Sequence, residues 1–142
     1  MNLLFSFAGR IGRGKWWLGL LLGILISGVI IGAGALMVPW SDVMLKGPDG
    51  QPITNPDGSF PIDFTSPKML PGFIGYGLGV LLSLWMGLAV HLKRLHDRGK
   101  SGWWVLIALI PLAGFIWMII DLGILEGQAG ANKYGPDPRG AI

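Results

Sequence analysis

Residues 16–38 read WWLGLLLGILISGVIIGAGALMV, a run of 23 residues without a charge, and this run decides the fold class. A helix of about 20 apolar residues crosses a bilayer core about 30 Å thick. Strands cannot satisfy their backbone polar groups singly in lipid, so the span is expected to be helical. We expect a retained anchor, because the run exceeds the ~7–15 apolar residues of a signal peptide.

Two further stretches have a similar length and composition. Residues 73–92 end at His91 and Leu92, and residues 103–125 contain Asp121 as their one charged side chain. The sequence therefore predicts a single all-α membrane domain, 1–142, with three transmembrane helices at about 16–38, 73–92 and 103–125. Pro111 and Gly114 could instead fold the third span into a re-entrant hairpin. We favour a kinked but continuous helix, because neighbouring groups can form the hydrogen bond to the backbone carbonyl that proline leaves without a partner.

The overall composition agrees with a chain that lies mainly in lipid. Charged residues make up 13% of the sequence, whereas a soluble domain has about 25%. The chain has no cysteine, which excludes disulfides, thiolate metal sites and a cysteine nucleophile.

The distribution of lysine and arginine predicts the orientation in the membrane. Seven of these residues lie before the first span or in the basic turn 93–102, and four lie in the loop 39–70 or the tail 126–142. Basic residues concentrate on the cytoplasmic side. We therefore expect a multi-pass membrane protein with a cytoplasmic N-terminus. The loop and the tail would lie outside, and Asp121 would lie at the outer interface.

The loop between the first two spans is rich in proline and glycine. Six of the ten prolines fall in residues 39–70, and Pro48-Asp49-Gly50 and Pro56-Asp57-Gly58 are turn signals. We expect an irregular external loop, and favour an exposed linker over a binding loop.

The basic turn and the N-terminal segment hold the candidate ligands for an anionic lipid headgroup. Lysine and arginine near a helix N-terminus can bind phosphate. The alternative is that these charges only fix topology. The candidates are Arg10, Arg13, Lys93, Arg94, Arg98 and Lys100. His91, His96 and Asp97 are expected to share a polar layer with them.

Small residues recur at four-residue spacing in the first two spans, which permits close helix packing. These ridges predict packing within the chain, or contacts with other copies. The residues are Gly19 and Gly23 in the first span, and Gly75, Gly79, Ser83 and Gly87 in the second.

No motif of catalysis or metal binding stands out. His91 and His96 are five residues apart, which places them about 140° apart around a helix. Neither a nucleophile motif nor a pair of carboxylates is present. We expect no enzyme activity, no metal and no cofactor.

Four motifs in order resemble a known family. They are Phe7-Ala8-Gly9-Arg10-Ile11-Gly12-Arg13, Arg94-Leu95-His96-Asp97, Ser101-Gly102-Trp103-Trp104, and a glycine-rich tail motif that contains Asn132, Tyr134 and Asp137. Together they resemble the bacterial inner-membrane family called domain of unknown function 805. The resemblance implies membrane location and architecture, and it brings no activity. The tail motif is either a folded cap or a knob that docks a partner.

We therefore expect a non-catalytic accessory or scaffolding module that packs against itself or other membrane subunits. The alternative is a protein that handles anionic lipid or a small solute through its basic turn. The expected partners are the lipid bilayer, further copies or a larger membrane complex, and no nucleic acid.

Overall fold

The computed structural model describes residues 3–140, and the elements found in them are helical. In chain order they are α1 (Arg13–Leu36), α2 (Trp40–Val43), η1 (Pro67–Met69), α3 (Leu70–Asp97), η2 (Gly102–Leu109), α4 (Ala113–Met118) and η3 (Ile119–Ile124). Extended pairing within 3–140 is limited to isolated bridges such as Met44 with Ile62. The all-helical fold class is confirmed.

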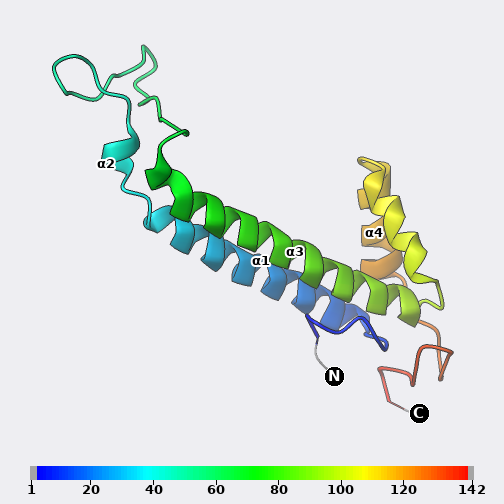
Figure 1. The fold of residues 1–142 in the computed structure, drawn as a ribbon. Helices are drawn as coiled ribbons and strands as arrows, with labels where there is room; N and C mark the ends of the chain where they lie inside the picture. Colours follow the sequence, from blue (N-terminus) through cyan, green and yellow to red (C-terminus); the bar gives the residue numbers. More distant parts are fainter. Residues whose placement is uncertain (1–2, 141–142) are drawn as a thin grey trace. The chain divides into compact units, whose positions relative to one another are not determined.

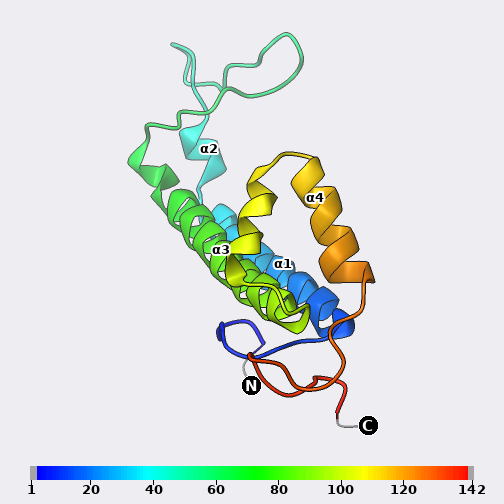
Figure 2. The same cartoon turned by 90° about the vertical axis from the view of Figure 1, so that its right-hand side faces the viewer.

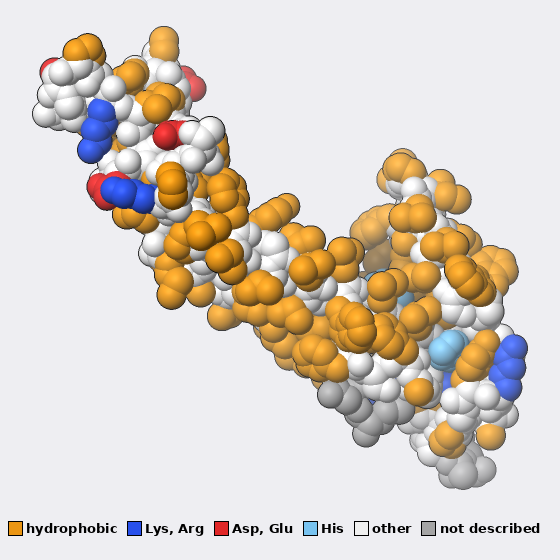
Figure 3. Space-filling view, viewed as in Figure 1, with side chains coloured by type: hydrophobic (Ala, Val, Ile, Leu, Met, Phe, Trp, Pro, Cys, Tyr) orange, Lys and Arg blue, Asp and Glu red, His pale blue; other side chains and the backbone are white. Residues whose placement is uncertain are grey.

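The first two predicted spans are confirmed as long apolar helices. Helix α1 has 24 residues, and η1 with α3 forms a second apolar helical stretch of 31 residues, 67–97. Both are long enough to cross a bilayer. Hydrophobic side chains cover the visible surface of α1 and α3 (Figure 3), as expected for helices that face lipid.

The chain forms two compact units, one comprising residues 1–25 and 81–142 and the other residues 26–80. In the first unit, the start of α1 packs on the end of α3 around buried Trp16, Met86, Val90 and Leu122. In the second unit, the end of α1 packs on the start of α3, and the loop has a small core of Val38, Val43 and Met69. Helices α1 and α3 (Figure 1) each contribute residues to both units.

The third predicted span is not a continuous helix. The segment 103–125 begins in η2, turns at residues 110–112, and returns through α4 and η3 as a hairpin (Figure 2). Ile110 is extended, with ψ 109°, because a residue that precedes proline is disfavoured in the helical region. Leu112 then takes a positive φ of 59°, which reverses the chain. The favoured expectation of a kinked, continuous helix is therefore wrong.

Contacts between the two arms hold this hairpin closed. A side chain at Gly114 would overlap the carbonyl of Ile107, so glycine is what allows the arms to meet. Trp104 of η2 stacks on Trp117 of α4 with ring centroids 5.8 Å apart. Helix α4 and η3 provide 12 residues of apolar helix, which is fewer than the ~17 of a short spanning helix.

Some of the glycines in the predicted ridges lie in the contact between α1 and α3. In the first unit, a Cβ on Gly19 would lie 2.7 Å from the Val90 side chain, and one on Gly23 would lie 3.9 Å from Met86. In the second, a Cβ on Gly75 would lie 2.7 Å from the Cα of Gly34. Gly79 likewise packs on α1, where Ile31 would overlap its Cβ. Ser83, in the first unit, is exposed.

Gly87 does not fit the predicted ridge. A Cβ at this position would meet nothing within 4 Å, so Gly87 takes no part in the packing of α3 on α1. A contact of Gly87 with another copy stays a prediction. Eight residues beyond Gly79, the helical repeat has carried the glycine off the contact face, because four residues advance a helix by about 400° rather than 360°. Its carbonyl contacts the Nδ1 atom of His91 instead.

The loop of the second unit is ordered by local turns. Asp57 accepts a hydrogen bond from the Ser59 amide at 2.9 Å, and Asp63 accepts one from the Thr65 amide at 2.9 Å. The Ser59 and Thr65 hydroxyls also donate to these carboxylates. The hydroxyl bonds are the main reason that the pKa of both carboxyls lies below the ordinary value, and the amide bonds add to the effect. Lys68 pairs with Asp42 at 2.8 Å across the base of the loop.

Candidate functional site

Arg10 is the centre of a buried polar cluster in the first unit. Its guanidinium donates to Asp97 Oδ1 at 3.1 Å, and to the carbonyls of Gly130 and Gln128 at 2.6 Å each. A fourth bond, of 3.3 Å, reaches the carbonyl of Gly135. Arg10 precedes α1, Asp97 ends α3, and the three carbonyls belong to the tail. One side chain therefore ties three distant segments together.

Arg94 completes the cluster from one turn earlier on α3. It forms an ion pair with Asp97, and its Nε donates to the carbonyl of Leu122 at 2.8 Å. The side chains of Arg10, Arg94 and Asp97 are 0%, 1% and 3% exposed. Two buried guanidiniums thus share one carboxylate, and the trio carries a net positive charge.

The tail folds over this cluster. The Gln128 amide donates to the carbonyl of Asp97 at 2.8 Å, and the Asn132 side chain donates to the carbonyl of His96 at 2.9 Å. Segments in direct contact cannot lie on opposite faces of a bilayer. The expected placement of the tail on the side opposite the basic turn is therefore wrong. It followed from treating residues 103–125 as a crossing helix, whereas the hairpin returns the chain to its starting side.

The remaining tail motif residues stabilise the fold of the tail. Tyr134 stacks on His96, with ring centroids 3.9 Å apart and planes at 9°. Asp137 accepts hydrogen bonds from the Gly130 amide at 2.9 Å and from the Arg139 side chain. The Arg139 hydrogen bond is the main reason that the pKa of Asp137 lies far below its ordinary value, and the same contact raises the pKa of Arg139.

The other basic residues of the turn also have partners within the chain. Arg98 and Lys100 pair with Asp121 at 3.1 and 2.7 Å. Asp121 therefore lies at the same end as the basic turn, and its expected position at the opposite interface is wrong for the reason given for the tail. Lys93 is buried and donates to the carbonyl of Leu3.

The two histidines lie apart from one another. His91 packs edge-on against Trp16 at 5.7 Å, while His96 lies under the tail. No group of three or more metal-ligating side chains occurs among the described residues.

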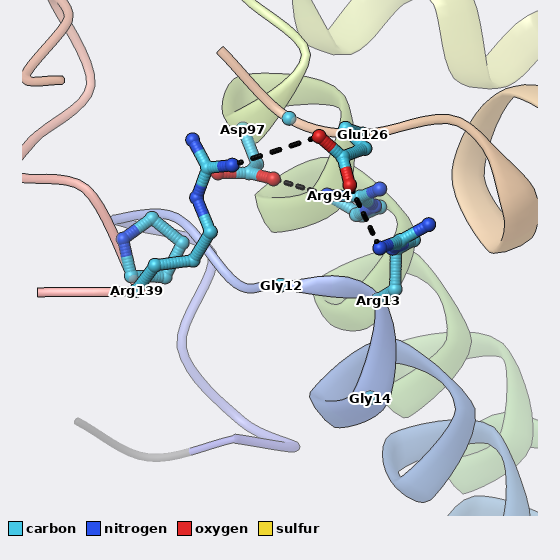
Figure 4. A pocket seen from close by; sticks show the side chains of 9 residues that line it. Gly12, Arg13, Gly14, Arg94, Asp97, Glu126 and Arg139 are labelled. Atoms are coloured by element: carbon cyan, nitrogen blue, oxygen red, sulfur yellow. Dashed lines mark hydrogen bonds and ion pairs between the residues drawn. The ribbon is translucent and has the colours of Figure 1, made fainter. Parts of the chain in front are cut away.

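A cleft of about 230 Å³ opens beside the cluster (Figure 4). Arg94 and Asp97 lie at its inner side, and Arg13, Glu126 and Arg139 line it from α1 and the tail. Glu126 lies between the two outer arginines, 3.0 Å from Arg13 and 3.9 Å from Arg139. These three side chains are 45–68% exposed, in contrast to the buried trio.

Two features of this site had weak sequence signals. Glu126 and Arg139 stand in the tail, which the span count placed on the other side of the membrane. Gly127 is needed because a Cβ there would overlap the Asp97 carboxylate, and Gly99 because one would overlap Gln128. Gly127 in the tail motif and Gly99 in the basic turn were the available hint that these two segments touch.

Long apolar helices with a buried, charged cluster at one end are typical of a small integral membrane protein. Comparison with known protein families agrees with this class. The family model described as "Protein of unknown function (DUF805)" matches residues 4–136. The chain belongs to this family.

Proteins similar in sequence to this chain are found in Escherichia coli. Inner membrane protein YhaH of strain K12 is 31% identical over 134 residues, covering 94% of this chain and 88% of the relative. The uncharacterized protein YiiR is 28% identical over 158 residues, covering 94% and 86%. Inner membrane protein YhaI is 38% identical over 52 residues, covering 37% and 43%. No solved structure matches. The family and the apolar helices identify a bacterial inner-membrane protein.

Proposed function

We propose that this chain is a non-catalytic accessory or scaffolding module of the inner membrane. The observation that supports this most directly is how the motif charges are used. Arg10, Arg94 and Asp97 bind one another and the carbonyls of the chain itself. Such groups close the fold, which is the role expected of a structural module.

The proposed topology is two spanning helices, α1 and α3, and a hairpin that enters the bilayer and leaves it on the same side. The ion pair of Lys100 with Asp121, 2.7 Å long, joins the two ends of the hairpin. With this path, nine of the eleven lysine and arginine residues belong to the N-terminal segment, the basic turn and the tail. Such an excess favours the cytoplasm for that end.

The proposed partner is another apolar membrane helix. Gly28 and Gly32 of α1 are not used in packing on α3, because a Cβ on either would meet nothing within 4 Å. Small residues four apart allow two helices to approach closely in lipid. We propose that this pair contacts a second copy or another membrane subunit.

The alternative function, lipid or solute handling by the basic turn, is less well supported. Arg94 and Arg98 donate to the carbonyls of Leu125 and Glu126, and so their guanidiniums are already engaged.

The test is association in the native membrane. The double variant Gly28→Leu with Gly32→Leu should lose crosslinks to its own copies or to a copurifying membrane subunit. Gly77→Leu is the matched control, because Gly77 of α3 also faces open space. Equal crosslinking in all three proteins, or no partner for the wild type, would contradict the proposal.

A further inference from the structure

We propose that the cleft lined by Arg13, Glu126 and Arg139 is a binding site for a phosphate group, and that the Glu126 carboxylate occupies it in the absence of ligand. Glu126 lies between the two guanidiniums (Figure 4), 3.0 Å from Arg13 and 3.9 Å from Arg139. Planar guanidiniums bind carboxylate and phosphate oxygens with the same paired geometry. A side chain 68% exposed can swing out to admit a ligand.

The inner side of the cleft favours an anion independently. Arg94 and Asp97 line it, and with Arg10 they form the trio in which two buried guanidiniums share one carboxylate. Backbone carbonyls of the tail and of η3 accept their remaining hydrogen bonds. These dipoles solvate the excess charge without cancelling it. A buried net charge is costly unless it is compensated, so an anion at the mouth is electrostatically favoured.

The backbone at the mouth is also open to a ligand. Helix α1 begins at Arg13, so the amides of its first turn have no acceptor within the helix. A Cβ on Gly12 or Gly14 would meet nothing within 4 Å, which leaves this backbone accessible. Phosphate binds at helix N-termini that combine free amides with positive charge.

The arginines exposed at the cleft are therefore not the arginines of the basic turn that the sequence offered as phosphate ligands. Arg94 and Arg98 are engaged by the chain itself and are mostly buried. Arg13 also donates to the carbonyl of Ile124 and Arg139 to Asp137, but both side chains are about half exposed. A guanidinium has five N–H donors, so each of the two has donors left for a ligand. The phosphate could belong to an anionic lipid headgroup or to a free phosphate compound, because the site recognises the group that they share.

The test uses the full-length protein in nanodiscs of zwitterionic lipid. One arm adds phosphatidylglycerol to the disc and counts retained lipid by native mass spectrometry. The other arm titrates inorganic phosphate and follows tryptophan fluorescence. Arg13→Gln and Arg139→Gln should each weaken binding about fivefold, the effect expected of one basic group near an anionic surface. Glu126→Gln should strengthen it by a similar factor, because the internal competitor loses its charge.

Lys133→Gln is the control, since this exposed tail lysine does not line the cleft. Binding in the lipid arm alone identifies a headgroup site, and binding in both arms identifies a general phosphate site. The gain in Glu126→Gln cannot arise from misfolding. Absence of binding in both arms, or equal binding by Glu126→Gln and the wild type, would overturn the proposal.

Discussion

Replacement of Arg10 by alanine should release the tail from the rest of the first unit. The substitution removes the 3.1 Å bond to Asp97 and the bonds to the carbonyls of Gln128, Gly130 and Gly135. Removal of one partner from a buried ion pair costs about 3–5 kcal/mol. We expect about 3 kcal/mol, the lower end of that range, because Arg94 still pairs with Asp97.

Hydrogen exchange in lipid nanodiscs measures this cost. The Gln128 amide bonds to the carbonyl of Asp97, so its protection reports closure of the tail. A loss of about 3 kcal/mol should accelerate its exchange about 150-fold, at 1.36 kcal/mol per factor of ten. Lys133→Ala is the control, because this tail lysine is exposed and does not take part in the bonds of Arg10. If Arg10→Ala exchanged no faster than Lys133→Ala, Arg10 would not be what holds the tail closed.

Two further predictions concern helix packing and pH. Gly79→Leu should lower the thermal stability of the protein in detergent, because a Cβ at Gly79 already overlaps α1, whereas Gly87→Leu should leave it unchanged; equal stability of the two variants would contradict the packing. The pKa of Asp137 is lowered in the folded tail. The Asp137 carboxylate therefore contributes fully to tail closure above about pH 4, the ordinary pKa of an aspartic acid. This contribution is lost as the pH falls towards the lower pKa of the folded state. Tail protection by hydrogen exchange should therefore decline below about pH 4 in the wild type, and Asp137→Asn should weaken this dependence. A wild-type profile matching that of Asp137→Asn would exclude a contribution of the Asp137 carboxylate.

The sequence predicted α1 and α3 because the information needed is local. A run of about 20 apolar residues in lipid has one stable backbone solution, and it requires no knowledge of the rest of the chain. The close contacts of Gly19, Gly75 and Gly79 follow from the same helical repeat. Gly87 lies off the contact with α1 because a ridge of fixed spacing drifts around the helix axis.

The hairpin could not be distinguished from a crossing helix by composition. Both have the same hydropathy, and the decision depends on the contact of Gly114 with Ile107 and on the positive φ of Leu112. Because residues 103–125 were predicted to cross the membrane, Asp121 and the tail were predicted at the opposite end of the helices from the basic turn. With the tail misplaced, Glu126 and Arg139 could not be recognised as neighbours of Arg13.

The buried cluster was predictable only in outline. The motifs place Arg10, Arg94 and Asp97 near one membrane interface, and this expectation needs no more than the positions of the helices. The acceptors that Arg10 uses in the tail are backbone carbonyls, which every residue has. A sequence does not indicate which of them a buried guanidinium will contact.

In the proposed topology, the tail, the basic turn and the N-terminal segment lie together on one face of the membrane. Because the chain has no cysteine, single cysteines can be introduced at Ser6, Ser59 and Lys133 and labelled with a membrane-impermeant maleimide. We expect labelling of Ser6→Cys and Lys133→Cys only in inverted vesicles, and of Ser59→Cys only in right-side-out vesicles. Labelling of Lys133→Cys together with Ser59→Cys would place the tail on the opposite face and exclude this topology.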